Sequence, residues 1–514
     1  MKKYLFGAAV QGIQRFIFQT GKLRHIVGAS ELVENICSNE FKDMVDKVGG
    51  GYHEDNAVLS AAGNIKYIFD HEEDCQAVVR EWPRHVARFA PGTEVSQAVV
   101  AYEETDSDTN FSDIVNTLES RLRTGRNRAM RSLTMGWMGV ERSRQTGLPA
   151  IAYEDKEHLD AGTFQKLFES KWSEIKRRRR TTERLCQKAF EDGIHTKQIA
   201  FEMEDMTRQN SWLAIIHADG NGLGQVVSKM GRNREKFKRF SKQLDQATIA
   251  AAREAYQSVK HLWNDNEMIP IRPIVLGGDD LTVICRADIA LPYTEAFLRA
   301  FETQTHALMG ESLKQFGIFP EGEDQHRLTA CVGIAFVKAS FPFYYGYELA
   351  EALCGRAKRN AKAGEGVEEG HVAPPSCLMF HKVQGSFTED FADIAKRELT
   401  PNAEMTFEFG PYYLHETAAK LHDRPTLAWL HEQVRELKDE EGNAVKSHLR
   451  QWLSQLHEKT AAADQTLKRL KKIATDKKEL IEALTEEVSN TKETKRIAAF
   501  DALAIHTIQT QVTR

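Results

Sequence analysis

The sequence predicts an α+β protein with two ferredoxin-like domains, a helical intervening region and a carboxy-terminal helical bundle. Two observations lead to this prediction. The order strand, helix, β-hairpin, helix, strand occurs twice along the 514 residues, and it is the order of the ferredoxin-like fold. After about residue 385, apolar residues recur at helical intervals. We therefore expect four domains, at residues 1–105, 106–208, 209–385 and 386–514.

The first copy of the repeated unit begins close to the start of the chain. The segment KYLFGAAVQG, residues 3–12, is typical of a strand, and a helical pattern follows it. The segment NAVLSAAGNIKYIFD, residues 56–70, has the pattern of a hairpin. A helix around residues 72–88 and a strand in EVSQAVVAYE, residues 94–103, complete the unit.

The second copy begins with a strand in SWLAIIHADGNG, residues 211–222. A long helix follows, because apolar residues from Phe237 to Leu262 recur at intervals of three or four and form one buried stripe. The hairpin IPIRPIVLGGDDLTVICR comes next, followed by a helix, the strand LTACVGIAFVKA and a helix in ELAEALCGRAKRNAK. Of the two hairpins, SAAGN and LGGDD, only the second carries acidic residues. We infer a duplication in which one half kept its chemistry.

The remaining regions carry no catalytic signature. Residues 106–208 are polar and mostly helical in pattern, with a break at GLPA, residues 147–150. The basic run from Lys176 to Arg180 is most simply a solvated helix face, with an RNA contact as the alternative. From Leu449 to Val488 the helical repeat suits a bundle or a docking surface for another subunit.

Composition excludes several classes of protein. The formal net charge is -5, so no overall basic field indicates nucleic acid. The seven cysteines are scattered without a C-x-x-C pair, which argues against a disulfide framework or a structural zinc. No apolar run approaches the roughly 20 residues that a membrane span needs. We expect a cytoplasmic protein without a membrane partner.

Three aspartates are the candidate metal ligands and catalytic residues. Asp219 ends the apolar run LAII, and Asp279 and Asp280 lie at the hairpin turn. The first and third strands of the unit are neighbours, so the three carboxylates can meet at one sheet edge. Carboxylates converging in this way repel one another unless a cation lies between them, and hard oxygen ligands suit Mg²⁺ (or Mn²⁺). Because neighbouring strand residues face opposite sides, we rank Asp279 with Asp219 as principal ligands and Asp280 as a second or outer ligand.

Glycines around these aspartates suggest room for a phosphate. Glycine permits turns with positive φ and the close approach of a ligand, and helix amino-termini attract phosphate. The long helix after Asp219 would offer such a terminus. The candidate nucleotide-binding positions are Gly220, Asn221, Gly222, Gly224, Gly277 and Gly278.

Three further side chains, and the hairpin turn itself, have both a functional and a structural interpretation. Lys358 and Lys362 are four residues apart on one helix face and could hold a triphosphate, although solvated helix lysines need no such role. His217 could share the face of Asp219, but a histidine satisfied in the core is the simpler interpretation. GGDD by itself could also be a tight turn capped by its own carboxylates.

These segments resemble the palm domains of the CRISPR polymerase, the large subunit of type III CRISPR effector complexes. The resemblance is strongest in HADGNGLG and LGGDD, and it extends to FGAAVQGIQRFIFQTGKLRHIVGASELVENI and FPFYYGYELAEALCGRAKRNAK. It covers both ferredoxin-like domains, which is most of residues 1–385. GGDD alone is shared with nucleotide cyclases and RNA polymerases, whereas its combination with the opening segment is specific.

The resemblance implies a function for the second palm domain. It would be a magnesium-dependent nucleotidyltransferase that converts ATP into oligoadenylate second messengers when guide RNA pairs with target RNA. Asp219, Asp279 and Asp280 would hold two metal ions, which would activate a ribose 3′-hydroxyl against an α-phosphate. The first palm domain would be degenerate. Guide RNA, target RNA and neighbouring effector subunits would be the partners.

The sequence also departs from the family pattern. The family often carries an amino-terminal histidine-aspartate nuclease domain; here the palm is expected to begin at residue 1 and His422-Asp423 is misplaced, so we expect no DNA cleavage. QTGLPA, residues 145–150, lacks the zinc cysteines that often precede this segment. The common D-G-D motif is Asp219-Gly220-Asn221 here, and a neutral Asn221 would bind a second cation less well. Some relatives without the nuclease join AMP to S-adenosylmethionine, which keeps that co-substrate open.

Two other classes of function stay open at this point. The chain could be a catalytically silent scaffold that binds guide RNA and neighbouring subunits, although its intact aspartates disfavour this. It could also be a free-standing nucleotide cyclase, although the long carboxy-terminal helical region, a docking surface without chemistry, disfavours that.

Overall fold

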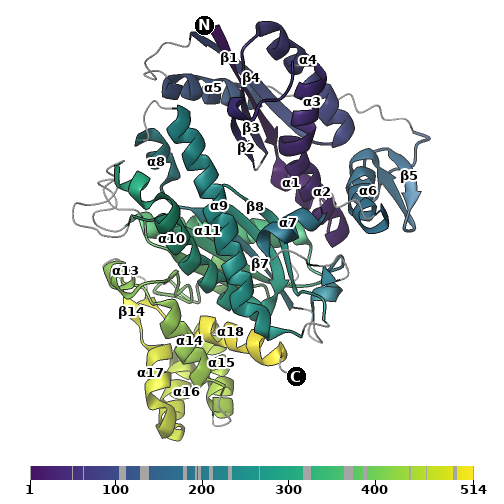
Figure 1. Ribbon diagram of the computed structural model, residues 1–514. Coiled ribbons are helices and arrows are strands. Elements are labelled where there is room, and N and C mark those ends of the chain that lie inside the picture. Colours follow the sequence, from purple (N-terminus) through teal and green to yellow (C-terminus); the bar gives the residue numbers. More distant parts are fainter. Residues whose placement is uncertain are drawn as a thin grey trace.

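The computed structural model (Figure 1) shows a mixed α+β chain, which confirms the predicted fold class at that level. The residues that the structure describes are 2–48, 50–61, 63–103, 111–127, 138–176, 182–190, 194, 198–207, 212–229, 234–264, 267–315, 326–363, 374–385, 390–438, 442–458, 460–489 and 495–512.

A four-stranded antiparallel sheet forms the amino-terminal part of the molecule (Figure 1). Its strand order is β2-β3-β1-β4, so the first and third strands are neighbours, as expected for a β-α-β-β-α-β unit. The elements come in the predicted order: β1 (Lys2–Gln11), α1 (Ile13–Phe18), α2 (Leu23–Asn35), α3 (Phe41–Val48), β2 (Ala57–Ala61), β3 (Asn64–Phe69), α4 (Glu72–Phe89) and β4 (Glu94–Glu103).

Both faces of this first sheet are buried, because neighbouring side chains of β1 enter different cores. Leu5 packs with Leu118 of α5 (Phe111–Arg126), a helix that follows the predicted boundary at residue 105. Phe6 lies on the opposite face, where its ring stacks on Phe41 with centroids 5.8 Å apart. Trp82 of α4 meets the same Phe41 ring edge-on at 5.3 Å.

The part of the chain that connects the first sheet to the second contains a short hairpin that the sequence pattern did not reveal. Its strands are β5 (Ala150–Glu154) and β6 (Glu157–Asp160), and α6 (Ala161–Lys176) and α7 (Thr182–Ala189) follow. Ile151 and Tyr153 are exposed, so β5 lacks the alternation that marks a half-buried strand. Residues 177–180 of the basic run lie outside the described residues.

A six-stranded sheet forms the centre of the molecule (Figure 1). Its order is β13-β11-β10-β7-β9-β8, and the four strands of the predicted second unit are adjacent within it. The strands are β7 (Trp212–Gly220), β8 (Ile271–Gly277), β9 (Asp280–Arg286), β10 (Ala330–Lys338), β11 (Cys377–Lys382) and β13 (Tyr412–Tyr413). The strands β11 and β13, which we did not predict, extend the sheet beyond β10.

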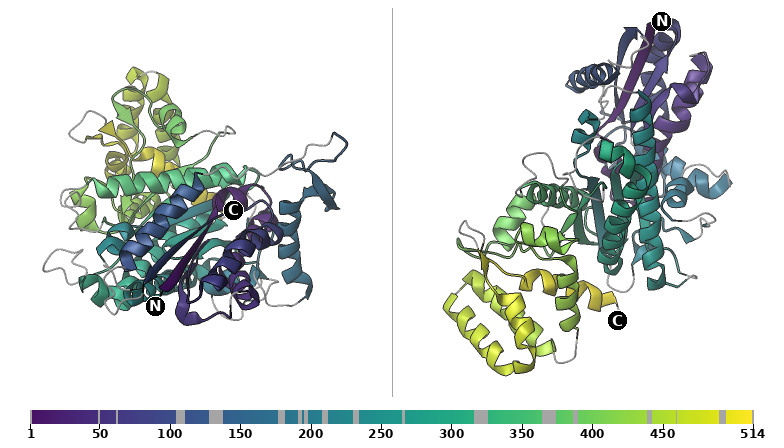
Figure 2. Two further views of the ribbon diagram at one scale, coloured as in Figure 1. Left: turned by 90° about the horizontal axis from the view of Figure 1, so that it is seen from above. Right: turned by 60° about the vertical axis from the view of Figure 1, so that its left-hand side comes forward.

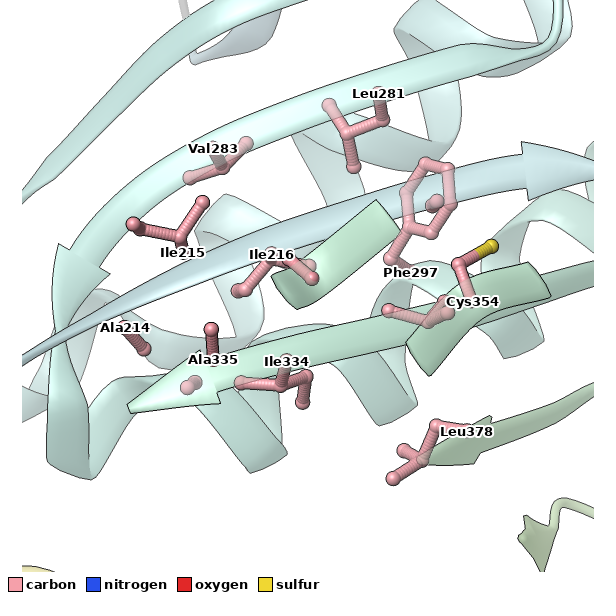
Figure 3. Close-up of a cluster of buried hydrophobic side chains, with 14 of the residues drawn as sticks. Ala214, Ile215, Ile216, Leu281, Val283, Phe297, Ile334, Ala335, Cys354 and Leu378 are labelled. Atoms are coloured by element: carbon pink, nitrogen blue, oxygen red, sulfur yellow. The ribbon is translucent and has the colours of Figure 1, made fainter. Parts of the chain in front are cut away.

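Helices cover both faces of the second sheet. Alternate residues of its central strands, such as Ile216, Val283 and Ile334, share one apolar face (Figure 3). Two long helices of the second unit, α9 (Arg234–Val259) and α10 (Ala290–Gln315), pack side by side. On the opposite face, α11 (Phe343–Lys362) lies so close to β10 that a Cβ on Gly333 would come within 1.9 Å of the Ala350 carbonyl oxygen.

The first sheet is joined to the second by α1 and α2, which lie between them in Figure 1. The Phe18 ring of α1 stacks on Tyr347 of α11 with centroids 4.2 Å apart. The hydroxyl of Ser30 in α2 donates to the backbone carbonyl of Ile274 in β8. Gln11, at the end of β1, and His217 of β7 line the same cavity.

The carboxy-terminal part is largely helical but not wholly so (Figure 2). A small sheet in the order β12-β15-β14 interrupts the helices, which corrects the expectation of helix to the end. The elements are α12 (Phe391–Glu398), β12 (Met405–Thr406), α13 (Glu416–Leu421), α14 (Leu427–Glu436), α15 (Gly442–Glu458), α16 (Thr460–Ile473), α17 (Lys478–Thr485), β14 (Val488–Ser489), β15 (Lys495–Arg496) and α18 (Ala499–Val512). Among the described residues, no helix is both long and apolar enough to cross a lipid bilayer.

Candidate active site

The structure brings the three predicted aspartates together. Asp219 is the penultimate residue of β7, and Asp280 is the first residue of the neighbouring strand β9. Asp279 lies in the tight turn that joins β8 to β9. One carboxylate oxygen from each residue lies within 4.8 Å of those of the other two. This spacing is suited to three oxygens around one cation.

The sheet register changes the basis on which the three ligands were ranked. Ala218 pairs with Leu281, so Asp219 and Asp280 lie on the same face of the sheet. Alternation does not apply to Asp279, because it lies in the turn outside both strands. Alternation therefore gives no reason to place Asp280 on a different face from Asp219, and both Asp279 and Asp280 lie within reach of it.

The free carboxylates destabilise one another. Burial, followed by the charge of Asp219, raises the pKa of Asp279 to about 6. Burial, followed by the charges of Asp279 and Asp219, raises the pKa of Asp280 to about 8. A bound divalent cation would relieve this repulsion, because it favours the ionised form of each carboxyl group. The donor set therefore fits a hard divalent cation such as Mg²⁺.

Of the two predicted lysines, only Lys358 contacts an aspartate of this site. Its ammonium group forms an ion pair with Asp219 and donates a 2.8 Å hydrogen bond to the backbone carbonyl of Gly220. Lys362 lies one turn later on α11 with an exposed side chain. Lys358 thus places a positive charge at the edge of the acidic cluster.

The glycines of the site have different roles. A Cβ on Gly220 would lie 2.8 Å from the Cβ of Asp279, so only glycine at this position leaves room for that aspartate. Gly278, in the turn, and Gly222 have φ values of 62° and 73°, which favour glycine. Gly277 ends β8 opposite Asp280, and Gly224 has open space around it.

The helix that follows Asp219 is not the long one that we expected. A short helix, α8 (Leu223–Lys229), comes first, and its initial turn is capped by the carbonyl of Gly222. The long helix α9 begins only at Arg234. The apolar stripe predicted the position of α9 correctly but gave no sign of the preceding seven-residue helix.

Two residues of α9 that we did not single out hold the GGDD turn in place. Asp245 accepts a 3.2 Å hydrogen bond from the backbone N–H of Gly278, and the hydroxyl of Thr248 donates a 2.6 Å bond to the Gly278 carbonyl. Burial raises the pKa of Asp245, and the nearby Lys188 opposes this rise. Both residues interrupt or flank the apolar stripe of α9, and a polar residue there is the signal that could have identified them.

Asn221 lies away from the carboxylates and is 1% exposed. Its side-chain amide donates to the hydroxyl of Thr329 at 3.2 Å and to the carbonyl of Pro374 at 3.3 Å. Its backbone N–H also donates to the Thr329 carbonyl at 2.8 Å. The side chain therefore joins the end of β7 to the segments that precede β10 and β11.

His217 is part of the core beside the cluster. Its Nδ1 lies 3.2 Å from the hydroxyl of Thr282, and its ring meets Tyr347 edge-on at 5.5 Å. Burial lowers its pKa to about 4, so the imidazole is neutral at physiological pH. A neutral, buried histidine is the structural role that we favoured for it.

A cavity of about 310 Å³ lies between the two sheets, next to the acidic cluster. Asp280 and Thr282 line it from the second sheet, and Tyr347 lines it from α11. The first unit contributes Gln11 and Asn64, at the positions equivalent to the end of β7 and the GGDD hairpin, and the carboxylate of Glu34 in α2. Arg126, which the sequence did not single out, adds a cation. Charged groups therefore line the cavity on both sides, with Asp280 on one side and Glu34 and Arg126 on the other.

Comparison with known proteins identifies the central domain. Residues 212–364 match the family model described as the second palm domain of Cas10/Cmr2. The matched segment contains all three aspartates and Lys358. The chain is Cas10-like. No curated protein is similar enough to match it.

Solved structures with the fold of this Cas10-like chain include crystal structures of the Csm1-Csm4 cassette. The complex with cA3 aligns with a TM-score of 0.55 and 13% sequence identity. The complex with one ATP has a TM-score of 0.54 at 13% identity, and the Csm1-Csm4 subcomplex in the type III-A CRISPR-Csm interference complex has 0.52 at 12%. In each case the alignment covers 100% of this chain and 70% of the other. At such low identity the likeness shows the fold alone.

Proposed function

We propose that this Cas10-like chain is a magnesium-dependent nucleotidyltransferase that uses ATP to make an adenine-nucleotide second messenger. The observation that carries the proposal is the convergence of Asp219, Asp279 and Asp280 beside the cavity between the two sheets. In the first unit, the equivalent hairpin provides Asn64 in place of acidic residues. The two units have the same strand order, and we propose that they are a degenerate and a catalytic palm domain.

The residues of the site would have two roles, metal binding and positioning of the GGDD turn. Asp219, Asp279 and Asp280 would hold Mg²⁺ (or Mn²⁺), which when bound supplies charge stabilisation to phosphate oxygens. Gly220 and Gly278 let the turn approach β7, while Asp245 and Thr248 fix it there.

Lys358 and Arg126 would provide positive charge for the nucleotide phosphates. Lys358 is already held beside Asp219, and Arg126 lines the cavity. A cavity of about 310 Å³ is at the lower end of the range typical of small-molecule sites. We propose that it receives ATP, with Gly222, Gly224 and Gly277 leaving the surrounding backbone unobstructed.

We also propose the setting in which the chain acts. The structural neighbours are named as parts of a Csm1-Csm4 cassette and of a type III-A interference complex. By analogy, the chain would act in the cytoplasm within an RNA-guided type III CRISPR complex, with guide RNA, target RNA and neighbouring subunits as partners. The four domains at 1–105, 106–208, 209–385 and 386–514 would serve catalysis and docking in that assembly.

The product is proposed as a cyclic oligoadenylate or as AMP joined to S-adenosylmethionine. The first product is favoured by the fold shared with the Csm1-Csm4 cassette, which has been crystallised in complex with cA3. The second product stays in the proposal because Asn221 stands where the common D-G-D motif has its second aspartate. Its side chain is buried, and the acidic cluster among the described residues consists of Asp219, Asp279 and Asp280.

One experiment tests the proposal. The protein, alone and with its co-purifying partners, is incubated with ATP and Mg²⁺ or Mn²⁺, with and without S-adenosylmethionine, and products are identified by mass spectrometry. Asp279→Ala combined with Asp280→Ala should abolish the product. Asp464→Ala, which removes an exposed carboxylate of α16, is the matched control.

Each alternative predicts a different outcome. No product under any condition, together with retained binding of RNA and subunits, would favour a catalytically silent scaffold. Full activity of the isolated chain, unchanged by RNA or partners, would favour a free-standing nucleotide cyclase. Undiminished product from the double variant would overturn the assignment of the aspartates.

A further inference from the structure

A second cavity, of about 550 Å³, lies where the edge of the central sheet meets the carboxy-terminal helices. Lys382 of β11 lines one side of it, and Arg450 and His457 of α15 line another. The helices α15 and α18 lie together below the central sheet in Figure 1 and enclose the cavity with their side chains. Among the described residues that line it, none carries a carboxylate.

Lys382 is an unusual residue to find in this place. It is only 9% exposed, yet it lies at the wall of the cavity. Its ammonium group is 4.8 Å from the ring centroid of Trp212, and Lys338 lies over the same ring at 4.3 Å. A cation–π contact offsets part of the cost of burying one ammonium group. Two ammonium groups therefore lie over the ring of Trp212.

The positive charge extends beyond Lys382. Burial, and then the charges of Lys338 and Arg450, lowers the pKa of Lys382 to about 8. Burial, and then the charges of Lys446 and Arg450, lowers the pKa of His506 in α18 to about 4. The charge of Arg450 thus lowers the pKa of both groups, in addition to the larger effect of burial. An anion in the cavity would stabilise both lysine and arginine side chains.

We propose that this cavity binds a phosphate group, carried either by an RNA strand or by a free nucleotide. Lys382 and Arg450 are charged donors of the kind that phosphate oxygens prefer. Arg450 also donates a 3.2 Å hydrogen bond to the hydroxyl of Thr507, which orients the guanidinium group at the cavity. The rings of Phe407 and Phe500 stack on one another, with centroids 5.7 Å apart, and form an apolar part of the wall. This site is separate from the acidic cluster and does not depend on the proposed catalytic activity.

The test uses the reactivity of Lys382 itself. The full-length protein is acetylated for short times near neutral pH, and the modification of each lysine is followed by peptide mass spectrometry. The probes are inorganic phosphate, ATP and a single-stranded RNA, each compared with chloride at equal ionic strength. We expect the acetylation of Lys382 to fall severalfold with a phosphate probe. The exposed Lys472 of α16, outside the cavity, should react at an unchanged rate.

The arms of the experiment distinguish the two sources of phosphate. Protection by RNA at much lower concentrations than by ATP identifies a strand as the ligand, whereas equal or better protection by ATP identifies a nucleotide. Arg450→Gln, a change at an exposed residue that should leave folding intact, is expected to weaken the protection, and Lys472→Gln is expected to leave it unchanged. Equal acetylation of Lys382 with all probes and with chloride would overturn the proposal.

Discussion

Lys358 is paired with Asp219, and it also donates a 2.8 Å hydrogen bond to the backbone carbonyl of the next residue, Gly220. One side chain from α11 thus balances a carboxylate of the acidic cluster and fixes the strand end that carries it. Its positive charge opposes the rise in pKa that burial and the neighbouring carboxylates cause at Asp279 and Asp280. In the absence of metal, Lys358 partly takes the place of a cation.

Replacing Lys358 should separate metal binding from turnover. In Lys358→Met the positive charge that competes with a bound cation is lost, so we expect Mn²⁺ to bind about fivefold more tightly at low ionic strength, a change of about 1 kcal/mol. Nucleotide product formation should fall at least about tenfold if the lysine holds a phosphate, by about 1.4 kcal/mol. Electron paramagnetic resonance titration of Mn²⁺ and product assays measure the two effects. Lys362→Met, on the same helix but exposed, should change neither quantity.

The acidic cluster should make the metal-free protein less stable as pH rises. The folded-state pKa values of Asp279 and Asp280 are about 6 and about 8, above the ordinary value of about 3.9. The folded state therefore binds more protons than the unfolded state between about pH 4 and pH 8, and the contribution of these groups to stability falls across that window. Added Mg²⁺ should raise the melting temperature more at pH 8 than at pH 6.

Other groups of the protein also titrate between pH 4 and pH 8. The test therefore compares the pH dependence of stability between the wild-type protein and a variant that lacks the two carboxyl groups. Melting temperatures in EDTA are compared between the wild-type protein and Asp279→Asn combined with Asp280→Asn, from pH 5 to pH 8. The variant should gain stability relative to the wild type as pH rises, and Mg²⁺ should not stabilise it. A difference that is constant with pH would contradict the coupling of the two carboxyl groups.

Gly220 and Gly224 should respond in opposite ways to an added methyl group. A Cβ on Gly220 would come within 2.8 Å of Asp279 Cβ and 3.0 Å of Leu223 Cδ1, so Gly220→Ala should displace the aspartate and abolish product formation. Gly224 lies in α8 with no atom within 4 Å of such a Cβ. Gly224→Ala should be neutral or stabilise the protein by up to about 1 kcal/mol. Equal loss of Mn²⁺ binding in both variants would contradict this account.

The sequence predicted the site better than its surroundings, for physical reasons. Asp219 and the GGDD turn could be placed together because the β-α-β-β-α-β order makes the first and third strands neighbours. The role of Thr248 could not be predicted, because its hydrogen bond to Gly278 joins residues that are 30 positions apart. The ligand ranking also needed the observed register, since a turn residue such as Asp279 escapes strand alternation.

The strands that the sequence did not predict lack a readable hydrophobic period. The strand β11 is buried along its whole length and carries no alternation, so its short apolar run could not be assigned from periodicity. The two-residue strands β12, β14 and β15 are too short to carry any period. By contrast, the stripe of α9 was predictable, because Leu244, Ala251 and Val259 repeat over many turns on one buried face.

Restoring an aspartate at Asn221 should harm the protein and add no metal site. The amide of Asn221 donates to the hydroxyl of Thr329 and to the carbonyl of Pro374, and Asn221 is 1% exposed. In Asn221→Asp the two donor contacts are replaced by a buried carboxylate facing a carbonyl oxygen. We expect a loss of about 2–3 kcal/mol in the free energy of unfolding, measured by urea denaturation. Asn221→Ala, which removes the donor without adding charge, should cost less, and Mn²⁺ titration should show no additional bound ion in the aspartate variant. An additional bound ion, or unchanged stability, would show that the side chain at position 221 can turn towards Asp219 instead.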